Sequence, residues 1–449
     1  MKKLRSMLNG GPNYVLGIDL GTSKIVAVIA ELTQGNHVKI VDVKDVASQG
    51  VHRGNIVNLE QVVTCVKQVS SQILRDNNLI AEDMKVVVAT FNAENCPNII
   101  SKGVVPIAQR GSDSIVTDED VENAVKRALD NLKLNHTLRS NTLLTAAHNI
   151  PIAYTLDGDR DVTHPVGMLA TQLEVTLLSI AVPKSSLRDV ANCFERAGLP
   201  LHALLFKPLA TSLGVPRHEA NVADNLILDI GAGTTDIAIF ANKRPCYFAS
   251  VPLGGNDISH DIFVVEHLPQ YKAEEIKQSI PLTNDIKQGD SLLFDFGGRS
   301  YDLDKQELQA IIGARIDSII SEKVKPVLAN SGASFERVLL TGGVARTKGI
   351  ENLVAETLDM PCRRILPTFG DQLVSEKYNE GYVTAMGVLR YIKARANSKI
   401  AYVDNLVGLG LLPWRLNGDD VAEAQGQGED FENEGNFFES FKSLWKSMF

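Results

Sequence analysis

Two similar segments, one near the N-terminus and one in the second half of the chain, constrain the fold most strongly. Residues 14–32 read YVLGIDLGTSKIVAVIAEL, and residues 225–240 read NLILDIGAGTTDIAIF. In each segment an apolar run ends at an aspartate, a glycine-containing turn follows, and a second apolar run leaves the turn. Short apolar runs on either side of such a turn predict a strand–turn–strand unit. Two copies so far apart predict an α/β protein of two related halves rather than a solenoid of short repeats.

The two turns carry the residue types that bind phosphate. Glycines let backbone N–H groups approach an anion closely, and successive N–H groups with small hydroxyls form a concave anion site. The aspartates that end the first strands, Asp19 and Asp229, repel phosphate unless a cation lies between them, and Mg²⁺ held through bound water fits this role. Either turn alone is also compatible with an ordinary hairpin, but two copies in register favour a nucleotide site. The predicted phosphate contacts are Gly21, Thr22, Ser23, Lys24, Gly231, Ala232, Gly233, Thr234 and Thr235.

A third glycine turn follows later in the chain. Residues 337–358, RVLLTGGVARTKGIENLVAETL, read as a short strand, a glycine pair and an amphipathic helix. In such an arrangement the backbone of the glycine pair can contact a sugar or a base, and the N-terminus of the helix points toward phosphate. Glycine pairs are common in α/β connections, so the signal gains its weight from its position after the two phosphate turns. We expect the nucleoside to contact Gly342, Gly343 and Val344.

The overall charge and the cysteines argue against several protein classes. A net charge of -9 argues against a general nucleic-acid binder, since such proteins need basic surfaces to displace counterions from phosphate. The five cysteines are scattered without a C-x-x-C pair, which is typical of reduced thiols rather than of a disulfide framework or a zinc site. No apolar stretch approaches the roughly 20 residues of a spanning helix. We expect a soluble or peripheral protein.

The C-terminal segment differs from the rest of the chain. Residues 417–436 contain seven acidic residues and no Lys or Arg, which predicts a disordered linker. Residues 437–449, FFESFKSLWKSMF, are predicted to form an amphipathic helix. Its polar face carries Glu439, Lys442 and Lys446. Too short to span a bilayer, this helix is expected to lie in a membrane interface; docking on the protein's own body or on a partner is the alternative. The apolar face comprises Phe437, Phe438, Phe441, Leu444, Trp445, Met448 and Phe449.

Together these motifs resemble the superfamily of actin, sugar kinases and heat-shock chaperones, whose members bind ATP between two lobes. Within it, the chain resembles the FtsA family of bacterial division proteins. The resemblance rests on the three glycine turns, on the terminal helix and on further family-typical stretches. These stretches are residues 53–58 (RGNIVN), 164–168 (HPVGM), 207–214 (KPLATSLG), 253–255 (LGG), 297–299 (GGR) and 381–387 (GYVTAMG).

The resemblance implies an actin-like α/β fold of two related lobes, with an FtsA-type inserted subdomain and a C-terminal amphipathic helix. Within the insertion we expect a helix at residues 118–132 that begins after the capping residue Thr117. The implied parts are a first phosphate-loop subdomain (1–90 and 167–200), the FtsA-type insertion (91–166), a second phosphate and adenosine subdomain (201–256 and 312–395), its own insertion (257–311), an acidic linker (396–436) and the membrane helix (437–449).

The resemblance also implies cofactors, partners and location. ATP and Mg²⁺ are the implied cofactors, and the FtsZ C-terminal peptide is the implied ligand of the insertion at 257–311. Arg299 is a candidate contact for that peptide, or simply an exposed arginine in a turn. The family assembles into filaments and recruits later division proteins through the insertion at 91–166. We therefore expect a peripheral protein on anionic lipid at the cytoplasmic face of the inner membrane, at the division septum, with no nucleic-acid partner.

One residue departs from the superfamily pattern. Chaperone and rod-shape relatives carry an acidic residue that positions the attacking water, and this chain has Lys207 there. A lysine cannot act as a carboxylate base, although its charge favours nucleotide binding. We therefore expect an ATP-binding structural protein with slow hydrolysis, not an enzyme. The alternatives are a sugar kinase, which has no use for a lipid-binding helix, a chaperone ATPase, which needs a separate β-rich substrate domain, and a pilus-assembly relative, which the tail disfavours.

Overall fold

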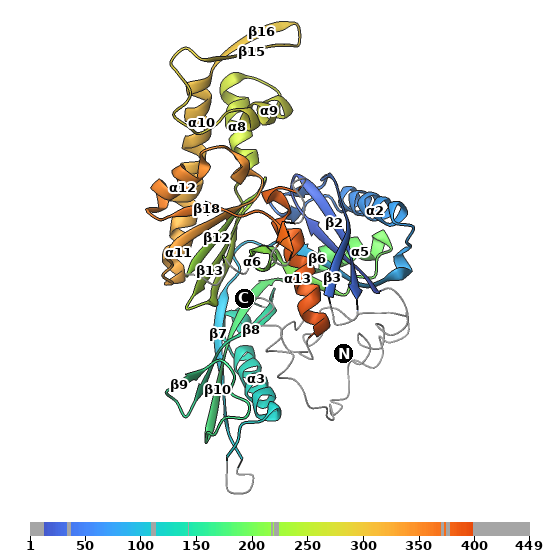
Figure 1. The fold of residues 1–449 in the computed structure, drawn as a ribbon, viewed down its shortest axis with the longest axis vertical. Coiled ribbons are helices and arrows are strands. Elements are labelled where there is room, and N and C mark those ends of the chain that lie inside the picture. Colours follow the sequence, from blue (N-terminus) through green and yellow to red (C-terminus); the bar gives the residue numbers. More distant parts are fainter. Residues whose placement is uncertain are drawn as a thin grey trace.

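The computed structural model of the chain describes residues 13–33, 37–108, 114–141, 143–216, 219, 224–369, 372–373 and 378–397. Two five-stranded sheets form the centres of two lobes, and two smaller parts project from them (Figure 1). The predicted terminal helix and residues 398–436 of the predicted acidic linker lie outside the described residues, whereas residues 396 and 397, also assigned to the linker, still belong to the last described helix. The five cysteines form no disulfide. Within the described ranges, every helix is too short or too polar to cross a bilayer.

The first lobe is built on a sheet with the strand order β11-β6-β1-β2-β3. β1 pairs antiparallel with β2 through the Gly21 turn and parallel with β6. Residues 15–20 of β1 are all buried, as expected of a strand covered on both faces of its sheet. The strands are β1 (Asn13–Leu20), β2 (Lys24–Thr33), β3 (His37–Ala47), β6 (Met84–Phe91) and β11 (Ala203–Phe206). The helices that pack on them are α2 (Leu59–Asp76), α5 (Lys184–Ala197), α6 (Lys207–Gly214) and α13 (Val383–Asn397).

The second lobe repeats this topology in the order β14-β13-β12-β17-β18. β12 pairs antiparallel with β13 through the Gly231 turn and parallel with β17, as β1 does with β2 and β6. The predicted pair of related strand–turn–strand units is therefore confirmed. The strands are β12 (Asn225–Ile230), β13 (Thr235–Ala241), β14 (Arg244–Val251), β17 (Arg337–Thr341) and β18 (Cys362–Arg364). The helices are α10 (Lys305–Ser318), a π-helical turn (Ile319–Val324), α11 (Lys325–Ser331) and α12 (Ile350–Leu358).

α6 and α13 pack on each other between the two lobes (Figure 1). Glycine makes this contact possible, because a Cβ on Gly387 would lie only 1.7 Å from the carbonyl oxygen of Ala210. A Cβ on Gly214 of α6 would lie 2.1 Å from the carbonyl oxygen of Val383 in α13. The family-typical stretch at residues 207–214 forms α6, and the stretch at 381–387 runs from a 3-10 turn at Glu380–Tyr382 into α13.

A four-stranded antiparallel sheet, β7-β10-β8-β9, forms the lower projection in Figure 1. α3 (Asp118–Lys133) packs on it and begins at Thr117, whose hydroxyl and backbone N–H both bond to Asp120, so the predicted helix start is confirmed. The part extends further than the predicted 91–166. β10 (Gln172–Pro183), which the sequence analysis assigned to the first subdomain, pairs with both β7 and β8. The apolar sequence of this strand is compatible with either sheet, and only its hydrogen-bonded neighbours show to which sheet it belongs. The other elements are β7 (Asn98–Pro106), β8 (Leu144–Leu156), β9 (Arg160–Val162) and α4 (His136–Ser140).

The upper projection in Figure 1 belongs to the second lobe and consists of two helices and a hairpin. Its apolar residues join the core beneath α10, which fixes the part to the lobe. Arg299 is the first residue of β16 and is exposed. The elements are α8 (Gly255–Glu266), α9 (Gln270–Ser279), β15 (Ser291–Phe296) and β16 (Arg299–Asp304). Short elements elsewhere are β4 (Val51–His52), β5 (Asn55–Ile56), β19 (Thr368–Phe369), β20 (Gln372–Leu373) and 3-10 turns at Ala81–Asp83 and Val344–Arg346.

Candidate functional site

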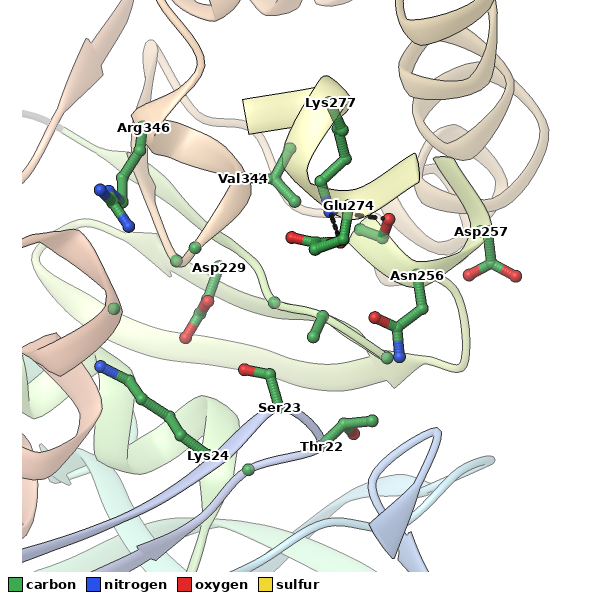
Figure 2. Close-up of a pocket in the computed structure, with 18 of the residues that line it drawn as sticks. Thr22, Ser23, Lys24, Asp229, Asn256, Asp257, Glu274, Lys277, Val344 and Arg346 are labelled. Atoms are coloured by element: carbon green, nitrogen blue, oxygen red, sulfur yellow. Dashed lines mark hydrogen bonds and ion pairs between the residues drawn. The ribbon is translucent and has the colours of Figure 1, made fainter. Parts of the chain in front are cut away.

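A cavity of about 1140 Å³ lies where the two lobes meet. The turn after β1, the turn after β12 and the turn after β17 all reach it, although they lie far apart in the sequence (Figure 2). Its volume slightly exceeds the roughly 300–1,000 Å³ usual for small-molecule sites. The sequence-predicted residues that line it are Asp19, Gly21, Thr22, Ser23, Lys24, Asp229, Gly231, Ala232, Gly233, Gly342, Gly343 and Val344.

Two predicted phosphate contacts do not line the cavity. The side chains of Thr234 and Thr235 are buried, and the Thr235 hydroxyl donates to the carbonyl oxygen of Leu253 at 2.9 Å. The carbonyl oxygen of Thr234 accepts the Gly231 N–H at 2.8 Å, which closes the turn. The sequence pattern could not separate the hydroxyls that face the cavity from those that hold the turn, because that depends on where β14 lies.

The two phosphate turns have the same internal bond and face each other. Gly21 N–H donates to the carbonyl oxygen of Lys24 at 3.1 Å, the counterpart of the bond that closes the Gly231 turn. A Cβ on Gly21 would lie 2.5 Å from that oxygen, and a Cβ on Gly233 would lie 2.6 Å from the Thr22 hydroxyl of the opposite lobe. Glycine is therefore required both within a turn and between the turns.

The aspartates of the two units are buried and hydrogen-bonded to threonines. Asp19 Oδ1 accepts from the Thr90 hydroxyl at 2.8 Å. Asp229 Oδ2 accepts from Thr211 of α6 and from Thr384 of α13, each at 3.1 Å. Burial raises the pKa of Asp229 above its ordinary value, and these bonds and the charge of Lys207 offset only part of the effect.

A third carboxylate, Asp236, lies beside these two and was not among the predicted site residues. Its Oδ1 accepts from Asn92 Nδ2 at 2.9 Å and from the Ser250 hydroxyl at 2.5 Å. Burial raises the pKa of Asp236 to about 6, and the charge of Lys207 opposes the shift. The sequence does show an aspartate after the second turn, but the first turn has Val26 at the paired position, so the comparison of the two units gave no signal.

Lys207, the first residue of α6, lines the cavity beside these carboxylates. Its Nζ lies 3.6 Å from Asp19 Oδ1, and its side chain is 13% exposed. Burial alone lowers the pKa of Lys207, but the attraction of Asp19, Asp236 and Asp229 outweighs burial and holds this pKa above its ordinary value. Lys207 therefore keeps its positive charge in the wall of the cavity, beside these carboxylates.

The residues present do not fit a Mg²⁺ ion bound directly by Asp19 and Asp229. One oxygen of each carboxylate is engaged by threonine hydroxyls, and the ammonium of Lys207 already lies at Asp19. The described ranges contain no group of three or more His, Cys, Asp or Glu side chains arranged to hold a metal ion. Mg²⁺ demands nearly octahedral coordination and repels an adjacent ammonium.

Lys24, a predicted phosphate contact, faces an aromatic ring. Its Nζ lies 3.1 Å from the centroid of the Tyr382 ring, and the Tyr382 hydroxyl donates to Asp45 at 2.8 Å. Burial lowers the pKa of Lys24 to about 8, although Asp45 and Asp19 oppose the shift. The contact links the first phosphate turn to the start of α13.

α9 contributes cavity residues that the sequence did not predict, among them Glu274 and Lys277. Lys277 Nζ donates to the carbonyl oxygen of Gly255 at 3.0 Å and to Glu274 Oε2 at 2.5 Å. Figure 2 shows both side chains above the cavity, opposite Thr22 and Ser23 of the first turn. A Glu-x-x-Lys pair on an amphipathic helix is so common that its spacing gives no functional signal.

One ion pair joins the lobes beside the cavity. Arg53 Nη2 lies 3.2 Å from Asp257 Oδ1, and both residues line the cavity. The other oxygen of Asp257 accepts the Gly254 N–H at 2.8 Å, which caps α8. Arg53 itself adopts a positive φ of 48° in the β4–β5 turn. The bridge therefore connects a strained turn of the first lobe to a helix N-terminus of the second.

Family models match two separate parts of the chain. The model described as "Cell division protein FtsA" matches residues 226–387, and the model described as "SHS2 domain inserted in FTSA" matches residues 97–181. The second range coincides with the sheet of β7, β8, β9 and β10, including the strand that the sequence analysis had misassigned.

Relatives match over nearly the whole chain. The cell division protein FtsA of Escherichia coli (strain K12) is 27% identical over 421 residues, which cover 90% of this chain and 96% of that protein. FtsA of Borreliella burgdorferi is 27% identical over 387 residues, which cover 84% and 91%. Among solved structures, a PilM-PilN type IV pilus biogenesis complex is 16% identical with a TM-score of 0.55, covering 85% of this chain and 98% of that chain. This last likeness shows the fold alone.

The predicted actin-like α/β architecture of two related lobes with an FtsA-type insertion is confirmed by the repeated sheet topology and by the SHS2 match. Both family models describe FtsA, and FtsA relatives match over 84% and 90% of the chain. The chain therefore belongs to the FtsA family of cell division proteins.

Proposed function

We propose that this protein is an ATP-binding, actin-like adaptor that polymerises and fastens the FtsZ ring to the cytoplasmic face of the inner membrane. The observation that carries the nucleotide part is the meeting of two related phosphate-type turns over one cavity. Membership of the FtsA family supports the role in division. The role in the membrane rests on the sequence of residues 437–449.

The cavity supports one orientation of ATP. The phosphates lie between the turns at Gly21 and Gly231, where backbone N–H groups and the Thr22 and Ser23 hydroxyls are available. The Glu274 and Lys277 side chains on the opposite wall supply an acceptor and a donor for the sugar hydroxyls. The remaining wall, Gly342, Gly343 and Val344, then faces the nucleoside.

The same site is poorly suited to fast hydrolysis. A general base must accept a proton from the attacking water, and Lys207, at the start of α6, is held in its charged form by the carboxylates around it. Asp19 and Asp229 already accept hydrogen bonds from threonines. Nucleotide therefore acts as a switch for assembly and is turned over slowly.

The two projections provide surfaces for partners. We assign the FtsZ C-terminal peptide to the projection of α8, α9, β15 and β16, where exposed Arg299 accompanies the exposed apolar side chains of Tyr271 and Leu293. An acidic peptide with apolar residues suits such a surface. Filament contacts and the binding of later division proteins belong to the SHS2 insertion, residues 97–181.

Attachment to the membrane depends on many weak anchors. The apolar face of residues 437–449 buries in the lipid interface, while Lys442 and Lys446 favour anionic headgroups. One short anchor binds lipid reversibly, and a filament that presents many raises their effective concentration. ATP-dependent assembly is in this way coupled to residence at the septal membrane.

The test is co-sedimentation of the full chain with vesicles containing anionic lipid, with and without ATP, followed by electron microscopy. The wild-type protein is expected to form filaments on the vesicles when ATP is present. Replacing Phe441 and Trp445 with Glu should leave the protein in the supernatant, because two charges then lie on the apolar face.

A matched control adds the same two charges to the polar face, as Ser443→Glu with Ser447→Glu. This variant should still bind the vesicles, although more weakly on anionic lipid. Equal release of both variants means that charge alone explains the effect and contradicts the interfacial helix. Binding of the apolar-face variant at the wild-type level contradicts membrane anchoring by this segment.

A further inference from the structure

The backbone at Lys207 is held rigidly, so this side chain places its charge in the site from a defined point. Lys207 is the first residue of α6, directly after β11, and Phe206 N–H donates to His148 Nε2 at 3.0 Å, which fixes the junction. Pro208 follows and fixes the backbone at the helix start. The Lys207 ammonium therefore enters the site from a rigid point rather than from a loop.

The ammonium lies where the negative charges converge. Its Nζ is 3.6 Å from Asp19 Oδ1 and 3.7 Å from where a Cβ on Gly21 of the first phosphate turn would stand. Asp229 and Asp236 are close enough to attract it as well. Three carboxylates thus share one buried cation before any phosphate arrives, and a triphosphate adds further negative charge beside them.

This arrangement bears on the divalent ion that a triphosphate site of this kind ordinarily needs. Charge repulsion between the strand-end aspartates and the phosphates predicts Mg²⁺ between them, and the Lys207 ammonium lies beside that space. Mg²⁺ keeps several waters and an octahedral shell, so it needs room as well as negative charge. An ammonium needs no octahedral shell, because it is a compact charge with three hydrogen-bond donors.

We propose that Lys207 replaces the divalent ion of this site, so that the protein binds the free triphosphate without requiring Mg²⁺. The inference rests on the proposed nucleotide function. Lys207 offsets part of the negative charge of Asp19 and Asp229 in the empty site and donates hydrogen bonds to the phosphate oxygens in the filled one. Without it, the three carboxylates regain the need for a metal ion.

The test measures the dissociation constant of a fluorescent ATP analogue for the full chain, in excess Mg²⁺ and in EDTA. The two dissociation constants of the wild-type protein should agree within about threefold, because its cation is part of the Lys207 side chain and EDTA cannot remove it. Lys207→Met keeps the length of the side chain and removes the charge, so its affinity in EDTA should fall by about tenfold or more relative to Mg²⁺. A tenfold change corresponds to about 1.4 kcal/mol, less than a charge pair at about 4 Å contributes in partly buried surroundings.

Two further variants separate charge from fold. Lys207→Arg retains a cation and should stay indifferent to EDTA, even if its affinity is lower in both conditions. Lys102→Met removes an exposed lysine, paired with Glu174 on the SHS2 insertion, and should match the wild type. Thermal unfolding without nucleotide gives a second readout: Mg²⁺ should raise the Tm of Lys207→Met and leave that of the wild type unchanged.

The outcomes distinguish this inference from the proposed function. Wild-type binding that requires Mg²⁺ overturns the inference while leaving ATP binding intact. So does Lys207→Met binding that stays indifferent to EDTA. If Lys207→Met does not fold, the wild-type comparison and Lys207→Arg still decide. Absence of nucleotide binding by the wild type in both conditions overturns the nucleotide function itself, and with it the role of Lys207.

Discussion

Two lysines that line the same cavity have opposite pKa shifts, because their neighbours differ. Burial lowers the pKa of Lys24 to about 8, since its ammonium faces the ring of Tyr382 and the two nearby carboxylates compensate only in part. The same burial acts on Lys207, but three carboxylates surround it and raise its pKa above the ordinary value. At the residue scale, the charge pattern of the cleft is thus a property of contacts rather than of composition.

Asp236 gives a pH-dependent test of this pattern. The folded protein binds the Asp236 proton more tightly than the unfolded chain, because burial raises its pKa from 3.8 to about 6. Relative to Asp236→Asn, wild-type stability should therefore be highest below pH 3.8 and be lost as pH rises through about 6. The full difference amounts to about 3 kcal/mol.

The measurement is urea-induced unfolding of both proteins at a series of pH values across this window. The difference between their free energies of unfolding is the quantity to follow, since it cancels most contributions of other titrating groups. Curves that run parallel from pH 4 to pH 7 contradict a raised pKa at Asp236.

At the scale of elements, the crossing of α6 and α13 holds the site together. Thr211 of α6 and Thr384 of α13 contact each other at 2.8 Å and both donate to Asp229. Their convergence depends on the close approach of the two helices, which Gly387 and Gly214 permit. The geometry of the carboxylate is therefore set by glycines that never touch the cavity.

Replacing Gly387 with Ala tests this dependence. The new Cβ would stand 1.7 Å from the Ala210 carbonyl oxygen, so the helices must separate. We expect a loss of stability of about 1–3 kcal/mol or more, together with weaker nucleotide binding, because Thr211 and Thr384 move away from Asp229. Chemical unfolding and a nucleotide titration measure the two effects.

The matched control is Gly313→Ala in α10. Its Cβ would meet only Leu282 Cδ2, at 4.0 Å, so helix propensity dominates. This substitution should stabilise the protein by roughly 0.5–1 kcal/mol and leave nucleotide affinity unchanged. Equal effects of the two substitutions indicate that glycine at the α6–α13 contact has no special role.

At the scale of the whole molecule, we expect a bound nucleotide to leave only when the two lobes separate. Few polar contacts between the described residues of the two lobes lie beside the cavity and hold the lobes together. Arg53 and Asp257 form such a contact from opposite lobes. A partly exposed ion pair contributes at most about 1 kcal/mol, which suits a latch that must open. We expect the larger α6–α13 contact, by contrast, to remain closed and to act as the hinge.

Arg53→Ala is expected to raise the dissociation rate of a bound fluorescent nucleotide by about two- to fivefold, in proportion to the small energy of an exposed pair. Stopped-flow displacement measures the rate. Arg244→Ala is the control, because it breaks the pair of Arg244 with Asp161, at 3.9 Å, without involving any residue of the cavity. An unchanged rate for Arg53→Ala would show that the bridge does not restrain the lobes.

The repeated unit, and hence the presence of two lobes, can be predicted from the sequence alone. An apolar run, an aspartate and a glycine turn are local features, and their repetition is visible without any knowledge of contacts. The residue types of the turns also indicated phosphate, since glycine and small hydroxyls act through the local backbone. The helix after Thr117 followed from local capping in the same way.

Only the tertiary structure decided which side chains meet. β10 was assigned to the wrong sheet, because its apolar pattern suits either one and pairing is a long-range choice. Glu274, Lys277 and Asp236 became site residues through the packing of α9 and β13 beside the turns, whereas Thr235 turned inward to Leu253. The sequence showed that Lys207 stands where related proteins have an acidic residue that positions the attacking water. Its place beside Asp19, where the sequence predicts a metal ion, emerged only from the fold, because the charge around a residue comes from chain segments far from it.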